Sequence, residues 1–148
     1  MTASSGSENR QNNVAATFAL PPDATAAAAA RSYVRRLLER WSLRSIVEPL
    51  SLVVSELAAN AARYGRPPLV LLLRRLGSGV RVEMHDESPE FHRKFPDPDV
   101  TSGEIEAEGG RGLRLVQAVS SAAGVEHIPD DGKRVWAVVE PDDRTSDK

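Results

Sequence analysis

Two strand-like segments joined by a very short turn constrain the fold of this chain more than any other feature. Leu69 to Leu76 is a largely apolar run, and Val80 to Asp86 alternates apolar and polar side chains. The residues between them, Gly77-Ser78-Gly79, have the composition and length of a tight turn. The two segments are therefore predicted to form an antiparallel hairpin that ends at Asp86.

A strand and two helices are predicted before this hairpin. Val14 to Leu20 is the predicted strand, and a pair of prolines ends it. Asp23 is predicted to cap a helix that continues to about Trp41. A second helix is predicted from Leu43 to Tyr64, where Gly65 ends it.

The remainder of the chain combines a long loop, a helix and a second hairpin. Glu87 to Glu108 is rich in proline and acidic residues and has no periodicity, so it is predicted to be a lid or a binding loop. Gly109 to Gly112 then opens a helix that is predicted to run to Ala122 and to end before Gly124. The last two predicted strands, Val125 to Ile128 and Lys133 to Glu140, are expected to form a closing hairpin.

These elements predict a single α+β domain. A chain of 148 residues is long enough for one sizeable core and too short for two ordinary domains. We expect a two-layer sandwich of a mixed, mostly antiparallel sheet of about five strands, with three helices on one face. The domain is predicted over residues 14–140, with disordered tails at 1–13 and 141–148, because those tails have almost no apolar side chains.

Composition excludes several classes of function. With a formal net charge of −2 the chain has no global electrostatic footprint for nucleic acid, and the absence of cysteine excludes disulfides and thiolate metal sites. The least polar stretch, Ala24 to Ala30, is short and is followed by Arg31, so no membrane span is expected. The cytoplasm is the expected location.

A carboxylate and an amide four residues apart form the main candidate site. Glu56 and Asn60 lie on one face of the second predicted helix, at the edge of its apolar stripe. That stripe consists of Leu50, Val53, Val54, Leu57 and Ala61. A magnesium ion and the phosphates of a nucleotide would satisfy such a pair, because hard cations take carboxylate and amide oxygens. The alternative is a solvated helix edge with a capping interaction to Arg63.

Together with two downstream loops, this pair resembles the N, G1 and G2 boxes of the GHKL (Bergerat-fold) ATPases. The matching segments are Glu56-x-x-x-Asn60-Ala61, Asp86 at a strand end, and Gly110-Arg111-Gly112-Leu113 opening a helix. The resemblance covers roughly Val14 to Glu140 and implies the histidine-kinase-like ATPase fold. The short single-domain form most resembles the serine kinases that act as anti-sigma factors, especially the actinobacterial members.

The resemblance implies a role for each motif residue. Asn60 would hold Mg²⁺, and Glu56 would be the general base that polarises a serine hydroxyl or a water for attack on the γ-phosphate. Asp86 would accept a hydrogen bond from the exocyclic amine of adenine and so select ATP over GTP. A strand-end aspartate that only turns the chain is the alternative for Asp86.

The glycine-rich segment is implied to bind the phosphates. Gly110 and Gly112 would let the backbone approach the negative charge at a helix N-terminus. Arg111 is a candidate phosphate contact, with an ordinary exposed arginine as the alternative. Leu113, which completes this motif, and Ser88, in the G1 segment, are further candidate nucleotide-binding residues.

Several residues depart from the family pattern. Asp86-Glu87-Ser88-Pro89 stands where many relatives have a glycine-rich G1 box, although the Ser-Pro variant resembles the actinobacterial branch. Tyr64 stands where relatives often have histidine. Ala59 and Arg134 stand where relatives often have threonine, and the loss of small hydroxyl donors would weaken nucleotide affinity.

The resemblance implies a Mg-ATP-dependent serine kinase that phosphorylates a STAS-type anti-sigma-factor antagonist and sequesters a sigma factor. Neither direct nucleic-acid binding nor membrane binding is expected, and a homodimer is compatible with the resemblance. One alternative is a non-catalytic interaction module with weak or lost ATP binding. Another is an unrelated α+β binding domain whose motifs coincide by chance, which would have no affinity for nucleotide.

Overall fold

The computed structural model of the protein describes residues 15–88, 110–129 and 132–142. The predicted tail at 1–13, most of the predicted loop Glu87 to Glu108, and residues 143–148 lie outside the described residues. In chain order the elements are β1 (Ala15–Leu20), α2 (Ala26–Trp41), the 3₁₀ turn η1 (Arg44–Ile46), α3 (Val47–Tyr64), β2 (Leu69–Leu76), β3 (Gly79–Asp86), α4 (Gly110–Val119), β4 (Ala122–Ile128) and β5 (Gly132–Val139).

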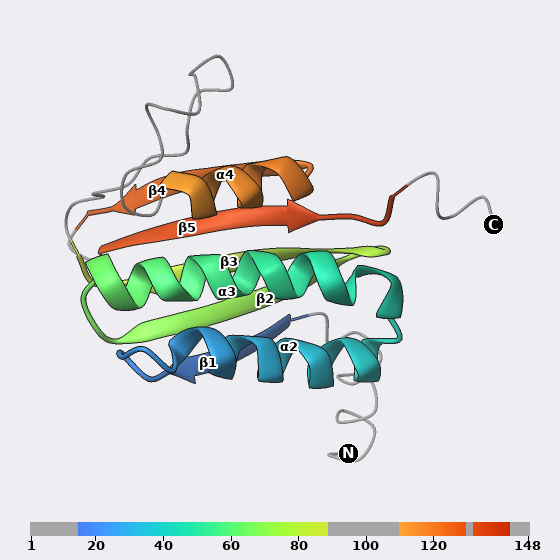
Figure 1. Ribbon diagram of the computed structural model, residues 1–148, viewed down its shortest axis with the longest axis horizontal. Helices are drawn as coiled ribbons and strands as arrows, with labels where there is room; N and C mark the ends of the chain where they lie inside the picture. Colours follow the sequence, from blue (N-terminus) through green and yellow to red (C-terminus); the bar gives the residue numbers. More distant parts are fainter. Residues whose placement is uncertain (1–14, 89–109, 130–131, 143–148) are drawn as a thin grey trace, which may run out of the picture.

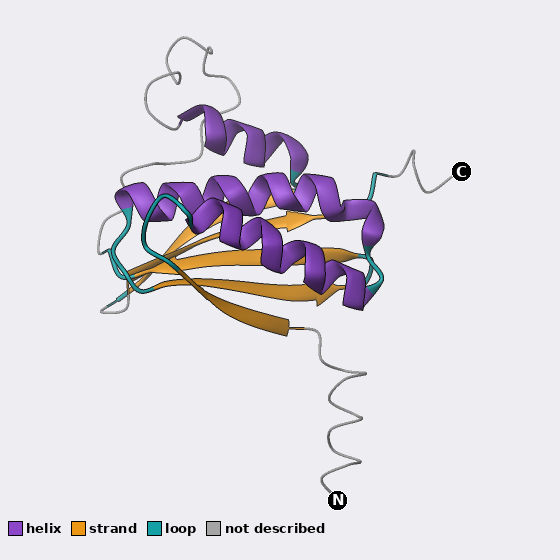
Figure 2. Ribbon diagram, turned by 60° about the horizontal axis from the view of Figure 1, so that its bottom comes forward, coloured by secondary structure: helices purple, strands orange, loops and turns teal. Residues whose placement is uncertain are grey.

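The strands form one sheet in the order β1-β2-β3-β5-β4 (Figure 1). All four pairings between neighbouring strands are antiparallel, so no parallel pair occurs among the described strands. The three α-helices lie together on one side of this sheet (Figure 2). The predicted α+β sandwich is therefore confirmed, and its sheet is antiparallel where a mixed one was expected.

Alternation along the strands divides the sheet into two faces. On β3, the buried side chains of Val80, Val82 and Met84 belong to the core beneath the helices, which defines the helix-side face. The intervening residues Arg81 and Glu83 point the other way, onto what we call the open face. The described helices leave the open face uncovered (Figure 2).

α3 is the central helix of the layer, because it packs against α2 on one side and α4 on the other. Its predicted apolar stripe is confirmed as buried: Leu50, Val53, Val54, Leu57 and Ala61. The edges of that stripe hold Glu56 and Asn60, which are both partly buried. None of the described helices combines the length and apolarity needed to cross a bilayer.

The starts of the first two helices differ from the predictions. Asp23 precedes α2 and closes a local turn, since its Oδ1 accepts from the Thr25 N–H at 2.8 Å and from the Thr25 hydroxyl at 2.5 Å. These two bonds lower the pKa of the Asp23 carboxyl. The second helix was predicted to begin at Leu43, but the chain makes the turn η1 first and α3 begins at Val47.

The end of the last helix also differs from the prediction. α4 ends at Val119, and Ala122 already belongs to β4. The Ser121 N–H donates to the Val138 carbonyl at 2.8 Å, so the chain joins the sheet edge at this point. Serine also favours a break in a helix, because its hydroxyl competes for the backbone hydrogen bonds. The pairing with β5 therefore overrides the local helical pattern.

Candidate functional site

Glu56 of α3 lies directly against Gly112 in the first turn of α4. A Cβ added to Gly112 would overlap Glu56 Oε1 and would lie 3.2 Å from Glu56 Cδ. The two helices can come this close at Gly112 because glycine has no side chain. The structure thus brings the predicted base and the predicted phosphate-binding loop together, although they are far apart in the sequence.

Asn60 lies one helical turn after Glu56 and has an unsatisfied amide. Its Nδ2 is buried and has no hydrogen-bond partner among the described residues. An unpaired buried amide nitrogen is costly, so a ligand oxygen at this position would be stabilised. Asn60 Oδ1 can bind a cation while Nδ2 donates to an anion, which suits a metal-bound phosphate.

Asp86 ends β3 on the helix-side face and is almost completely buried, with 2% of its side chain exposed. Its Oδ1 accepts from the Ser88 N–H at 2.7 Å and from the Arg66 N–H at 3.3 Å. The carboxylate also packs against Gly65, where an added Cβ would be 2.8 Å from Oδ2. Asp86 therefore ties the end of β3 to the segment that follows α3.

Lys133 at the start of β5 completes the surroundings of this carboxylate. It is the register partner of Asp86, and its Nζ lies 3.1 Å from Oδ1 and 2.8 Å from Oδ2. Only 5% of the Lys133 side chain is exposed, so water screens this ion pair weakly. Asp86 is thus both the predicted base contact and one half of a buried ion pair.

The residue before Lys133 is a glycine, and its backbone conformation brings the start of β5 close to the end of β3. Gly132 has φ +92°, a conformation that favours glycine. A Cβ at this position would overlap the Asp86 carbonyl oxygen and would lie 2.7 Å from Glu87 Cα. Gly132 therefore allows β5 to begin directly beside the end of β3.

The other predicted site residues differ in which of their groups face the site. Ser88 is buried and contributes its backbone N–H to Asp86. Leu113 is 1% exposed and its side chain packs in the core, so its backbone N–H is the group of this residue suited to a phosphate. Gly110 and Arg111 form the start of α4, while the side chain of Arg111 lies outside the described part of the structure.

The site is elongated along the second half of α3. At about 1.5 Å per residue, roughly 13 Å of helix separates Glu56 from Gly65, which touches Asp86. One end therefore offers a carboxylate, an amide and a glycine at a helix N-terminus, which suits phosphates and a metal ion. The other end offers a buried carboxylate acceptor, which suits the amino group of a base. The residues present fit a bound Mg-nucleotide.

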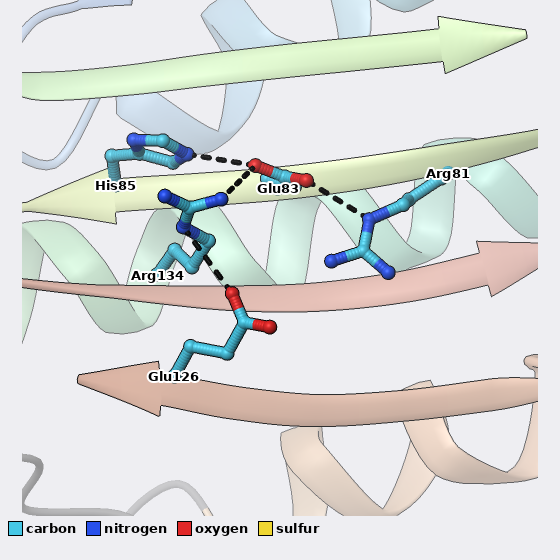
Figure 3. A network of polar contacts seen from close by, with 5 residues as sticks. All are labelled: Arg81, Glu83, His85, Glu126 and Arg134. Carbon is cyan, nitrogen blue, oxygen red and sulfur yellow. Dashed lines mark hydrogen bonds and ion pairs between the residues drawn. The ribbon is translucent and has the colours of Figure 1, made fainter. Parts of the chain in front are cut away.

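A second cluster of charged groups lies on the open face (Figure 3). Glu83 contacts Arg81 at 2.9 Å, His85 at 2.9 Å and Arg134 at 3.5 Å, and Arg134 also lies 3.4 Å from Glu126. Burial by itself raises the pKa of Glu83, but the hydrogen bonds from His85 and Arg81 and the two arginine charges lower it overall.

This cluster shows where Arg134 points. Its guanidinium contacts carboxylates of the open face, whereas the neighbouring residue Lys133 points to the site. The residue of β5 that faces Asp86 is therefore Lys133, which the motif comparison did not single out. The sequence signal that could have identified Lys133 was its position directly after the glycine of a hairpin, on the strand expected to pair near Asp86.

Comparison with known families gives one match that spans most of the chain. Residues 20–139 match the family model described as the histidine kinase-like ATPase domain. The matched range contains the whole site, from Glu56 to Lys133. A search of curated proteins found no match.

Proposed function

The chain belongs to the histidine kinase-like ATPase domain family, and on that basis we propose that it is an ATP-dependent serine kinase of the anti-sigma-factor type. It would bind Mg-ATP, phosphorylate a serine of a STAS-type antagonist and sequester a sigma factor. Family membership supports the binding of ATP. The choice of a protein serine as acceptor comes from the resemblance of this short domain to the anti-sigma-factor kinases.

One observation carries the catalytic part of the proposal. Glu56 is held at the N-terminus of α4, against Gly112, where the amides of a first helical turn attract phosphate. Asn60, with its unsatisfied Nδ2, lies one turn away on the same helix. A general base and a phosphate site thus share one small region of the domain.

Phosphoryl transfer assigns distinct tasks to these residues. Mg-ATP would supply the phosphoryl group, and its metal ion would neutralise the charge that develops during transfer. Glu56 accepts the proton of the attacking serine hydroxyl as the serine oxygen bonds to the γ-phosphorus and the bond to the bridging oxygen breaks. Asn60 would hold the metal ion, and Gly112 would leave room for the backbone to approach the phosphates.

The test uses the purified chain, STAS-type proteins from the same organism, and ATP labelled at the γ-phosphate. We expect transfer to a serine, and a rate about 10²–10⁴-fold lower for Glu56→Ala, the range usual for loss of a general base. Mg-ATP affinity should stay close to the wild-type value in that variant, since Glu56 acts on the nucleophile. Undiminished transfer by Glu56→Ala would contradict the assignment of the base.

The second candidate is a non-catalytic regulator that holds partners through its surface. The buried ion pair of Asp86 with Lys133 favours it, because the base contact already has a partner inside the protein. Ala59, which is exposed beside Asn60 and lacks a hydroxyl, also agrees with it. This candidate predicts weak or absent Mg-ATP binding and no labelled product with any STAS-type protein.

A further inference from the structure

The two oxygens of the Asp86 carboxylate have different numbers of hydrogen-bond donors. Oδ1 accepts from the backbone N–H groups of Ser88 and Arg66 and also contacts the Lys133 ammonium. Oδ2 has one donor among the described residues, the same ammonium at 2.8 Å. Since each carboxylate oxygen has two lone pairs, Oδ1 is saturated and Oδ2 retains one acceptor position.

Lys133 has two effects on this carboxylate. The ammonium occupies one acceptor position of Oδ2 at 2.8 Å. The ammonium also bridges both oxygens, so the plane of the carboxylate is set jointly by β5 and by the two backbone amides. Asp86 is therefore a fixed acceptor with one position on Oδ2 that no described residue fills.

A single acceptor distinguishes between the purines. Adenine presents one donor, its 6-amino group, beside the acceptor N1. Guanine presents two neighbouring donors, N1–H and the 2-amino group, which a carboxylate binds best with both of its oxygens. It also presents a 6-oxo group, which an acceptor-only side chain cannot bind. Because Oδ1 is saturated and Lys133 leaves a single position on Oδ2, the two neighbouring donors of guanine are disfavoured.

We propose that Lys133 is a specificity-determining residue of the nucleotide site, which reserves one oxygen of Asp86 for a 6-amino purine. The inference rests on the proposed nucleotide-binding function. Lys133 acts through Asp86, as a positioning residue. Its replacement leaves Oδ1 with its two backbone donors but opens a second acceptor position on Oδ2, removes the charge that holds the carboxylate, and so relaxes the choice of base.

The experiment measures the dissociation constants of Mg-ATP and Mg-GTP by titration calorimetry for the whole chain and its variants. We expect the wild type to prefer ATP, and Lys133→Met to reduce the ATP-over-GTP preference by about tenfold, the effect of one hydrogen bond to a charged group. Lys133→Arg, which keeps the charge and the donors, should retain most of the preference.

Arg81→Met is the matched control. Arg81 also pairs with a carboxylate of β3, Glu83 at 2.9 Å, but it does so on the open face. The control should therefore keep the wild-type preference. If circular dichroism shows that Lys133→Met does not fold, Lys133→Gln, which keeps a donor and loses the charge, should show a smaller drop in the same direction.

The outcomes separate this inference from the proposed function. A wild type that binds neither nucleotide would overturn the proposed function and the inference with it. A wild type that prefers ATP, combined with a Lys133→Met variant of unchanged preference, would overturn the inference alone. Equal weakening of both nucleotides would also overturn it, because a merely structural role lowers both affinities together.

Discussion

Each face of the sheet holds a carboxylate of β3 in ion pairs, but the two carboxylates differ in the number and the exposure of their partners. On the helix-side face, Asp86 is paired with one ammonium, and the two side chains are 2% and 5% exposed. On the open face, Glu83 is shared by Arg81, His85 and Arg134, whose side chains are 25%, 32% and 31% exposed. Both carboxylates belong to β3, and their partners include neighbouring residues of β5.

The difference shows how burial decides what an ion pair can do. A buried charge that loses its partner cannot return to water, so each member of the Asp86 and Lys133 pair depends on the other. Glu83 is itself 10% exposed, but its three partners are partly exposed and can be rehydrated. The buried pair therefore suits a site that needs one fixed acceptor, and the open-face cluster is a tolerant surface network.

The largest effect is expected for Asp86→Ala. It leaves the Lys133 ammonium buried without its carboxylate, and we expect the free energy of unfolding to fall by about 3–5 kcal/mol. ATP binding should be lost as well. Urea denaturation followed by circular dichroism measures the first effect, and a loss below about 1 kcal/mol would remove the contrast between the two faces.

A smaller effect is expected for Gly132→Ala. The new Cβ would meet the backbone of Asp86 and Glu87 at a positive φ, so we expect the free energy of unfolding to fall by about 1–3 kcal/mol. Gly124→Ala is the matched change beside the open face, where the Cβ would lie 2.9 Å from Cζ2 of Trp136. That ring is a side chain and can shift, so thermal denaturation should show a smaller loss of stability for Gly124→Ala than for Gly132→Ala.

Glu83→Ala should destabilise the protein by only about 1 kcal/mol. Its three cationic or polar partners are partly exposed and regain water when the carboxylate is removed. ATP affinity should not change, because the residue faces away from the site. Urea denaturation of Glu83→Ala beside Asp86→Ala tests the ranking directly, and equal losses would contradict it.

The smallest effect is a dependence of stability on pH. The pKa of Glu83 is lowered in the folded protein, because its polar partners outweigh the effect of burial. Its contribution is therefore complete above the unfolded pKa of about 4.3 and is lost as the pH falls through the lower folded pKa. The stability difference between the wild type and Glu83→Gln should shrink below about pH 4.3. A constant difference down to about pH 3 would refute this assignment.

Much of the fold was predictable because it follows from local patterns. The strands β2 and β3 and the apolar stripe of α3 were found almost to the residue, since alternation and helical periodicity report burial directly. The boundary between α4 and β4 was missed. Ala122 to Gly124 is compatible with either element, and the pairing with β5 decided the outcome.

The residues of the candidate site could be proposed from the sequence, and their roles stay predictions. Glu56 and Asn60 were recognised by their helical spacing, and Asp86 by its place at a strand end. Lys133 was missed, because its role depends on the register between β3 and β5. Arg134 and Lys133 are neighbours in the sequence, and only the alternation of the finished strand assigns one to each face.

The amino-acid sequence by itself determined the α+β class, the order of most elements and the residue types available to a nucleotide. Those properties depend on periodicity, on turn residues and on short motifs, which are local. Only the tertiary structure decided that Glu56 meets Gly112 and that Asp86 meets Lys133. These contacts join segments distant in the chain, and their energies depend on burial and exact spacing, which exist only once the sheet and helices have packed.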